Sequence, residues 1–190
     1  MTGTRLLSQA IAEGDGISVL VEVVDGAGAR TAEEQGAEGL VVRRPTSGLR
    51  ESTRLPLLAF GRPSEARDVD ALVLDVAEHG DLLGEAVDAA HARGLECVIR
   101  VRDEDELEEV LELVDPEILL LSAEDADDGQ DHLERLLELL PDIPAGKLAI
   151  AELAGASRYD VLELERAGVD AVIVSGSDVG SLVGDALPDV

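Results

Sequence analysis

Eight short apolar runs constrain the fold of this chain more than any other feature of its sequence. Each run is four to eight residues long, and Gly, Pro or Asp residues lie at its ends. Continuous apolar runs of this length are typical of strands that are buried on both faces of a sheet. The predicted strands are Ile17–Val24, Gly39–Val42, Leu55–Phe60, Ala71–Val76, Glu96–Val101, Ile118–Ser122, Leu148–Ala151 and Ala171–Val174.

Amphipathic stretches between these runs predict helices. The clearest is Asp103–Val114, in which Asp103 can cap the first turn and Leu107, Val110 and Leu111 share one apolar stripe. Between the third and fourth strands, Arg62–Val69 leaves room for a helix of only a turn or two. Similar helical patterns cover Asp81–Arg93, His132–Leu140 and Arg158–Ala167.

A glycine repeatedly stands between a predicted helix and the strand that follows it. Gly36, Gly94 and Gly168 occupy this position, which is typical of a helix that ends in a left-handed glycine and feeds a parallel strand. Eight strand-helix units favour closure into a (βα)8 barrel, the TIM barrel, over the alternative of an open doubly wound sheet. The 190 residues would make a minimal barrel, with residues 1–190 forming one domain and 1–16 a short helical lead-in.

The charge balance excludes two classes of partner. Acidic residues number 42 against 15 basic ones, a net charge of −27 that would repel nucleic acids and anionic membrane surfaces. Fourteen of the basic residues are Arg and only Lys147 is Lys, a bias that suits a GC-rich genome or a salt-adapted cytoplasm. We therefore expect no nucleic acid and no membrane partner.

The same composition predicts a cytoplasmic chain without a metal or cofactor. Met1–Gly16 has no apolar run of signal-peptide length, and no segment has the roughly 18 apolar residues of a membrane span. Cys97 is the only cysteine, which excludes an internal disulfide, and no His pair stands at metal-ligand spacing. Cys97 lies inside an apolar strand and is predicted to be a small core residue. His91 and His132 are predicted to lie on helices far from the strand C-termini, without a role.

Two segments carry a resemblance to a known family. They read Gly-Leu-Glu-Cys-Val-Ile-Arg-Val-Arg-Asp-Glu-Asp-Glu-Leu at 94–107 and Ala-Gly-Val-Asp-Ala-Val-Ile-Val at 167–174. The chain resembles indole-3-glycerol phosphate synthase, best over Arg93–Val179. The resemblance implies a ribulose-phosphate-binding barrel of tryptophan biosynthesis. It also implies a carboxy-lyase, which closes an indole ring on a phosphorylated anthranilate-ribulose with loss of carbon dioxide.

The resemblance also implies that most of this chemistry has been lost. Glu22 and Glu152 match two acidic positions of the family, and they are the candidate catalytic residues, as acid and base, if burial raises their pKa values. The family's two lysine positions fall on Val24 and Phe60. Its fifth-strand Glu, sixth-strand Asn and seventh-strand Ser fall on Arg100, Ser122 and Leu153.

The lysine count supports the same conclusion without an alignment. Lys147 precedes the seventh strand, which puts it at the end of the barrel opposite the usual active site. Arg cannot replace a lysine acid, because its pKa is too high for it to release a proton near neutrality. Synthase activity is therefore expected to be weak or absent, and whether the chain is an enzyme stays open.

The strand C-termini supply candidate binding residues. Gly155 follows the seventh strand, and Ser175, Gly176 and Ser177 follow the eighth, where barrels of this class often bind phosphate. The alternative is two ordinary loops with a helix cap. Arg43, Arg62 and Arg100 could form a cationic patch, or each could pair with a carboxylate, for instance Arg100 with Glu22 or Glu152. The candidate substrate-binding residues are Arg43, Arg100 and Ser122.

Three functional hypotheses remain. The first is a divergent synthase, and the second is a non-catalytic barrel that binds a phosphorylated small molecule or regulates a protein partner. A different lyase or isomerase is the third, because a fold does not fix a function. Convergence of Arg43, Arg100 and the Ser175–Ser177 loop on one pocket would imply a ligand, whereas a pocket filled by Phe60 and Leu153 would favour an interaction role.

Overall fold

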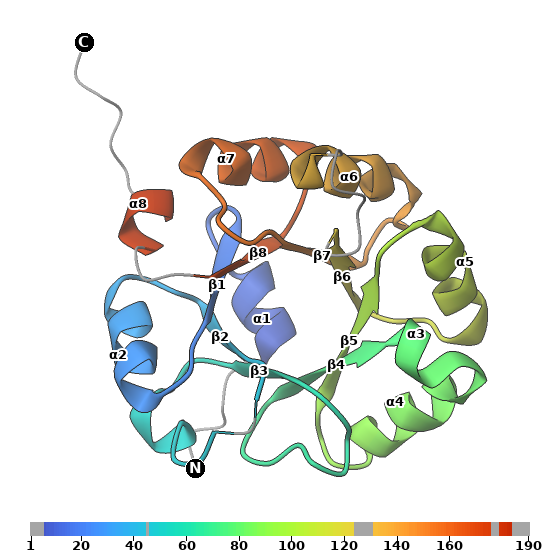
Figure 1. The fold of residues 1–190 in the computed structure, drawn as a ribbon, viewed down its shortest axis with the longest axis horizontal. Helices are drawn as coiled ribbons and strands as arrows, with labels where there is room; N and C mark the ends of the chain where they lie inside the picture. The colour runs from blue at the N-terminus through green and yellow to red at the C-terminus, as the bar shows by residue number, and fades with distance from the viewer. Residues whose placement is uncertain (1–5, 45, 124–130, 176–178, 184–190) are drawn as a thin grey trace.

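The structure is a closed barrel of eight parallel strands, as the sequence predicts. It is a computed structural model that describes residues 6–44, 46–123, 131–175 and 179–183. Each strand pairs with the next, and β8 pairs with β1 from Ser18↔Ala171 to Glu22↔Ser175. This closure excludes the open sheet (Figure 1). The strands are β1 Ser18–Glu22, β2 Gly39–Val42, β3 Leu57–Phe60, β4 Ala71–Asp75, β5 Glu96–Val101, β6 Ile118–Ser122, β7 Leu148–Glu152 and β8 Ala171–Ser175.

The helices begin and end at the signals that the sequence provides. Asp103 accepts a hydrogen bond from the backbone N–H of Glu106 at the start of α5, and Gly168 ends α7 with φ = 96°. Gly36 and Gly94 also have positive φ, at 92° and 75°. The helices are α1 Leu7–Ala12, α2 Gly26–Glu34, α3 Val76–His79, α4 Leu83–His91, α5 Glu104–Leu113, α6 His132–Leu139, α7 Arg158–Ala167 and α8 Val179–Val183. Three 3₁₀ turns, η1 Arg50–Ser52, η2 Gly80–Leu82 and η3 Leu140–Asp142, complete the described elements.

The predicted short helix within Arg62–Val69 is absent. This connection between β3 and β4 consists of turns, and it contains Gly61 at φ = 136° and Asp68 at φ = 56°. Both values lie outside the helical region, and Pro63 has no N–H to contribute. Loops therefore cover the outside of the barrel here, between α2 and α4 in Figure 1, where a helix would normally pack.

Two apolar layers hold the barrel together. Residues that point out of the barrel pack beneath the helices, whereas residues that point inward form a separate cluster. Because Trp is absent and Phe60 is the only Phe, branched aliphatic side chains fill the interior. The central part of the interior takes one residue from each strand, in two layers of four from alternate strands: Leu20, Leu58, Val98 and Ile150, then Val41, Val73, Leu120 and Ile173.

The inward residues two positions further along each strand are polar at seven of the eight positions. Side chains alternate along a strand, so these residues point to the same side as the two central layers but lie at the C-terminal end of the barrel. We call them the mouth ring: Glu22, Arg43, Phe60, Asp75, Arg100, Ser122, Glu152 and Ser175.

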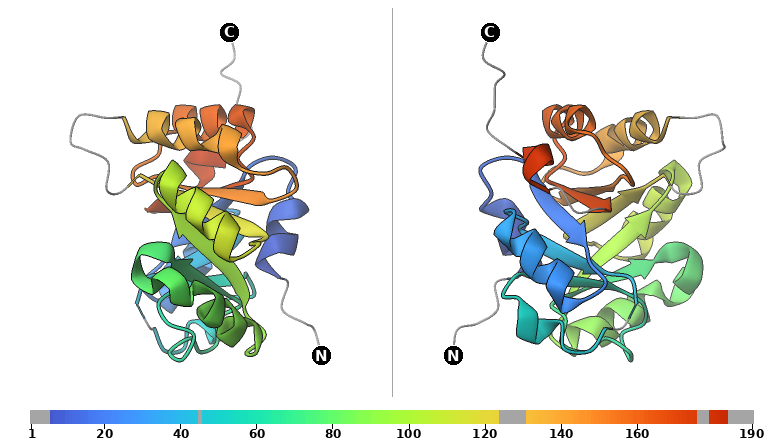
Figure 2. Two further views of the ribbon diagram at one scale, coloured as in Figure 1. Left: turned by 90° about the vertical axis from the view of Figure 1, so that its right-hand side faces the viewer. Right: turned by 60° about the vertical axis from the view of Figure 1, so that its left-hand side comes forward.

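Helix α1 closes the opposite end of the barrel. Leu7 and Ile11 pack into the inward cluster, and Figures 1 and 2 show α1 lying across that end. Glu96, at the start of β5, accepts hydrogen bonds from the backbone N–H groups of Leu7 and Ser8, at 2.6 and 3.3 Å, and from the Ser8 hydroxyl. Among the described residues, no helix is both long enough and apolar enough to cross a membrane.

The Glu96 contact predicts that a single substitution will loosen this end of the barrel. Glu96→Ala should lower the free energy of unfolding by about 1–2 kcal/mol, because the first N–H groups of α1 lose their acceptor. The control, Glu109→Ala on the exposed face of α5, should change it by less than about 0.5 kcal/mol. Urea denaturation followed by far-UV circular dichroism measures both, and equal effects would show that α1 is held by other contacts.

Candidate functional site

A continuous chain of ion pairs crosses the mouth of the barrel. Arg43 bridges two carboxylates: its Nε lies 3.2 Å from Glu22 Oε2, and its Nη2 contacts Glu152 Oε1. Glu152 Oε2 in turn lies 3.1 Å from Arg100 Nη2. These four side chains come from β1, β7, β5 and the residue after β2, so the chain of ion pairs ties together strands that lie far apart in the sequence.

The chain continues beyond Arg100 toward α5. Arg100 Nη1 lies 3.6 Å from Asp75 Oδ2, and Arg102 Nη1 donates to Asp75 Oδ1 at 2.9 Å. The same Arg102 atom lies 3.1 Å from Glu106 Oε1. We call the whole set the mouth network: Glu22, Arg43, Glu152, Arg100, Asp75, Arg102 and Glu106.

The positive and negative charges of the mouth network nearly balance. Its three arginines alternate with four carboxylates, which leaves an excess of one negative charge. Of the two arrangements that the sequence allowed for Arg43 and Arg100, the structure has the one in which each pairs with a carboxylate. Their assignment to substrate binding stays a prediction.

The acidic partners hold the network arginines firmly in their charged form. Burial lowers the pKa of Arg43, but hydrogen bonds to Glu152 and Glu22 and the charges of both carboxylates outweigh it, and the pKa is raised. The hydrogen bond to Asp75 is the largest of the effects that raise the pKa of Arg102. Neither arginine can therefore act as a proton donor near neutral pH.

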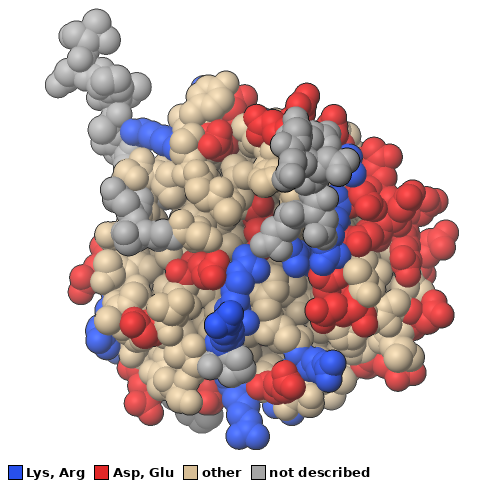
Figure 3. Space-filling model, in the orientation of Figure 1, with Lys and Arg blue, Asp and Glu red and all other residues tan. Residues whose placement is uncertain are grey.

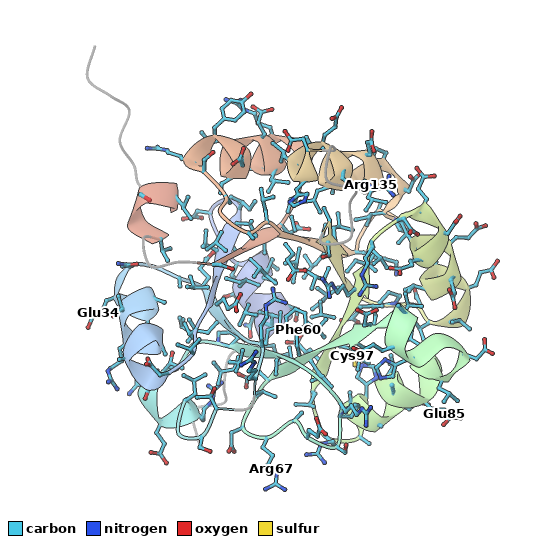
Figure 4. The ribbon with its side chains drawn as sticks, in the orientation of Figure 1. Glu34, Phe60, Arg67, Glu85, Cys97 and Arg135 are labelled. Carbon is cyan, nitrogen blue, oxygen red and sulfur yellow. The ribbon has the colours of Figure 1, made fainter. Side chains whose placement is uncertain are left out.

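Two serines and Phe60 position the network. The Ser122 hydroxyl, fully buried, accepts a hydrogen bond from Arg100 Nη2 at 2.8 Å, and the Ser175 hydroxyl donates to Glu22 Oε2 at 3.1 Å. The Arg43 guanidinium lies 4.4 Å from the centre of the Phe60 ring, a cation–π contact. Figure 4 shows Phe60 near the middle of the barrel opening. These contacts fix the two central arginines in place.

A small cavity lies beside the network, at the C-terminal ends of β7 and β8. Its volume is about 130 Å³, roughly the liquid volume of four water molecules. This is below the range of about 300–1,000 Å³ that is usual for sites of drug-sized ligands, but it suits a phosphate-sized group. The described residues that line it are Glu22, Arg43, His132, Glu152, Ala154, Ile173 and Ser175.

His132 is a residue of the mouth, contrary to the sequence prediction that it lies far away. It is the first residue of α6, and a helix that follows a barrel strand begins at the C-terminal end of that strand. The sequence signal for this position is Asp131, the residue directly before His132. Asp131 caps α6 and accepts a hydrogen bond from the Leu133 N–H. His132 thus faces the same cavity as Glu22 and Glu152.

The predicted phosphate loops are only partly described. Gly155 is exposed and has φ = 71° in the turn after β7, and Ser175 ends β8; Gly176 and Ser177 lie outside the described residues. Ser157 and Asp160 form a capping box at the start of α7, so part of that helix terminus is already satisfied by its own side chains. The assignment of these loops to phosphate binding stays a prediction.

The remaining reactive groups lie away from the mouth. Lys147 contacts Asp115 and donates to the Pro116 carbonyl at 2.8 Å, at the N-terminal end of the barrel. Cys97 is 9 % exposed, and burial raises the pKa of its thiol to about 11, which suits a core residue. Among the described residues, no cluster of His, Cys, Asp and Glu could hold a metal ion.

The chain is similar in sequence to curated proteins of one kind. No family model matches the chain. A curated indole-3-glycerol phosphate synthase from Geobacillus sp. (strain WCH70) is 26% identical over 168 residues, which cover 78% of this chain and 65% of the relative. A second, from Variovorax paradoxus (strain S110), is 32% identical over 112 residues, which cover 58% of this chain and 42% of the relative. The chain is related to the indole-3-glycerol phosphate synthases.

The sequence similarity covers only part of each synthase. The chain covers less than two thirds of the length of these synthases. Two solved structures share the fold at low identity. Thiamine phosphate pyrophosphorylase from Pyrococcus furiosus has a TM-score of 0.67 at 18% identity and covers 87% of this chain and 90% of its own. N-acetylmannosamine-6-phosphate 2-epimerase from Clostridium perfringens has a TM-score of 0.68 at 16% identity, with coverage of 86% and 88%.

The relationship to the synthases makes the two apolar positions at the mouth informative. Resemblance places family lysines at Val24 and Phe60. Here Val24 is 78% exposed beyond the end of β1, and Phe60 lies beneath Arg43. The family's Glu position is Arg100, whose side chain is 10% exposed and joined to two carboxylates. Val24, Phe60 and Arg100, the three positions to which the resemblance assigns proton-transferring groups of the family, carry side chains that cannot exchange a proton near neutrality.

The burial of Arg100 predicts a large stability effect at the mouth. Arg100→Met should lower the free energy of unfolding by about 3 kcal/mol, because Glu152 and Asp75 lose a partner in a region that excludes water. The control, Arg135→Met, removes a half-buried arginine that pairs with the exposed Glu138 on α6, and it should cost less than about 1 kcal/mol (Figure 4). Similar losses in the two variants would mean that the network contributes no more than a surface pair.

Proposed function

We propose that this chain is a non-catalytic barrel, derived from a synthase-like ancestor, that binds a phosphorylated small molecule at its mouth. The indole-forming ring closure of its relatives is weak or lost. The observation that carries this proposal is the mouth network, in which Arg43, Arg100 and Arg102 are each joined to a carboxylate. The only lysine lies at the other end, so the mouth has no lysine that could act as a cationic acid to expel hydroxyl groups from a substrate.

A phosphorylated ligand is supported by the position of the small cavity. It borders Ala154 and Ser175, where the β7 and β8 connections begin, and these are the connections that hold phosphate in many barrels. Arg43 and His132 supply N–H donors there. The synthases, the pyrophosphorylase and the epimerase all have names that include a phosphorylated compound. Their names support this ligand class for the present chain without identifying the ligand.

One observation favours a second candidate, a lyase or isomerase of another kind. His132, Glu22 and Glu152 border one cavity, and a histidine beside carboxylates is a common arrangement for moving protons. Against it, both carboxylates already hold Arg43, and their charges are committed to that ion pair. We therefore place the binding function first.

The loss of ring closure can be tested directly. Purified protein given 1-(2-carboxyphenylamino)-1-deoxyribulose 5-phosphate should release no indoleglycerol phosphate above the rate without protein, because no lysine lies at the mouth and Arg43 and Arg100 are held in ion pairs. Product formation is followed by the absorbance of the indole ring, with an active synthase as the positive control. Turnover comparable to that control would overturn the non-catalytic part of the proposal.

Phosphate binding requires a separate measurement. Glycerol 3-phosphate and the same carboxyphenylamino-deoxyribulose phosphate should raise the melting temperature, since a ligand at 100 times its Kd adds about 2.7 kcal/mol of stability. Glycerol should have no effect. Ser175→Asp should abolish the shift by placing a carboxylate in the cavity, whereas Ala145→Asp adds the same charge at the opposite end and should retain it. The absence of a shift with both phosphates would overturn the ligand assignment.

A further inference from the structure

A second cavity, larger than the one at the mouth, lies beside the mouth rather than in it. Its volume is about 630 Å³, and it lies between the β2–β3 and β3–β4 connections. Its apolar wall is formed by outward-facing strand residues together with residues of the two connections: Val42, Leu49, Leu57, Ala59, Val69 and Leu72. None of the network carboxylates lines it, so it is separate from the 130 Å³ cavity, although Arg43 borders both.

The missing helix accounts for this cavity. In a (βα)8 barrel, the outward face of each strand is covered by a helix, which buries its apolar stripe there. The β3–β4 connection has turns instead, and Ala59 and Ala66 are too small to fill the space. The result is a hollow with an apolar wall and a polar rim, of a size usual for a small-molecule site.

The rim of the cavity is basic in a strongly acidic chain. Five arginines and three carboxylates line it, against a net charge of −27 for the whole protein. Two of these arginines are engaged elsewhere, Arg43 in the mouth network and Arg50 with Asp70 at 2.6 Å. Figure 3 shows basic side chains running from the mouth toward this side, whereas acidic side chains gather over α5 and its neighbours.

Arg44 and Arg62 are the two rim arginines that can take a ligand. Both are exposed, and neither has an ion pair with any residue that the structure describes. Arg44 follows the C-terminal end of β2 and Arg62 that of β3, which are adjacent strands of the sheet. Arg67 also lines the cavity, but its side chain points away from the barrel in Figure 4. Guanidinium groups bind carboxylate and phosphate through paired N–H donors.

We propose that this cavity is a binding site for a small amphiphilic anion. The ligand has a hydrocarbon body, which lies against Leu57, Ala59 and Leu72, and a single carboxylate or phosphate group that pairs with Arg44 and Arg62. The site takes no part in the mouth network, so the proposal stands independently of the function proposed above.

Calorimetric titration with short-chain probes tests the proposal. Octanoate and octyl phosphate, used below their micelle-forming concentrations, should bind with one-to-one stoichiometry. Octylammonium has the same chain with the opposite charge and should bind at least about tenfold more weakly, because the rim repels it. Inorganic phosphate has no apolar body and should also bind more weakly than octyl phosphate. Equal affinity for octylammonium and octanoate would overturn the proposal.

Three variants locate the site. Arg44→Gln/Arg62→Gln should weaken octanoate binding by about tenfold or more, because it removes charge-assisted hydrogen bonds. The matched control, Arg135→Gln/Arg166→Gln, removes two arginines of α6 and α7 that lie outside the cavity and should leave affinity unchanged. Ala59→Leu should fill the cavity and block both octyl probes. Circular dichroism verifies that each variant is folded.

The remaining outcomes are also decisive. Ser175→Asp alters the mouth cavity and should not change octanoate binding; a loss there would place the probe in the mouth and overturn the proposal. If the wild type binds neither octyl probe and Ala59→Leu only raises the melting temperature, the cavity is a packing defect. Binding that is unaffected by Arg44→Gln/Arg62→Gln would equally contradict the assigned site.

Discussion

The buried carboxylate of Glu152 is the group on which the arrangement of the mouth depends. Its side chain is only 5% exposed, and an ionised carboxylate in such a position is costly unless positive groups and hydrogen-bond donors surround it. Arg43 and Arg100 meet this need from opposite sides. Because each of them also holds a second carboxylate, Glu22 or Asp75, one buried charge determines the positions of four others. The remaining members of the mouth ring contact this set: Ser122 bonds to Arg100, Phe60 packs against Arg43, and Ser175 bonds to Glu22.

This arrangement explains why a barrel can retain its fold while its chemistry changes. The inward residues of the two central layers are all aliphatic, and the helices pack on the other side of the strands. Substitutions in the mouth ring therefore leave both apolar layers intact. The charges of Arg43 and Arg100 lie at one end of the barrel, in ion pairs outside both apolar layers. The fold and the charge arrangement of the mouth therefore depend on different residues of the same strands.

The sequence predicted the barrel because local signals and overall topology agree. Glycines such as Gly94 and Gly168 mark helix ends, apolar runs mark strands, and a parallel order follows from their alternation. Two features were not predictable in this way. The β3–β4 connection depends on the backbone angles of Gly61 and Asp68, which side-chain periodicity does not report. The helical pattern around His132 predicts a position far from the mouth. However, the first residue of a helix lies beside the C-terminal end of the preceding strand, which places His132 at the mouth.

The sequence does not determine whether the mouth arginines pair with carboxylates, and the physical reason is a different one. Arg43 and Arg100 lie near the ends of β2 and β5, and whether they present charge to a ligand depends on which carboxylates the barrel closure brings within reach. Closure puts β1 beside β8 and so places Glu22 and Glu152 on either side of Arg43, although 130 positions separate them in the chain. The same closure leaves Arg44 and Arg62 outside the ring, where no carboxylate of the mouth network reaches them. Neighbouring arginines in the sequence, Arg43 and Arg44, are thus committed to opposite uses: one neutralises buried acids, and the other keeps its charge at the surface.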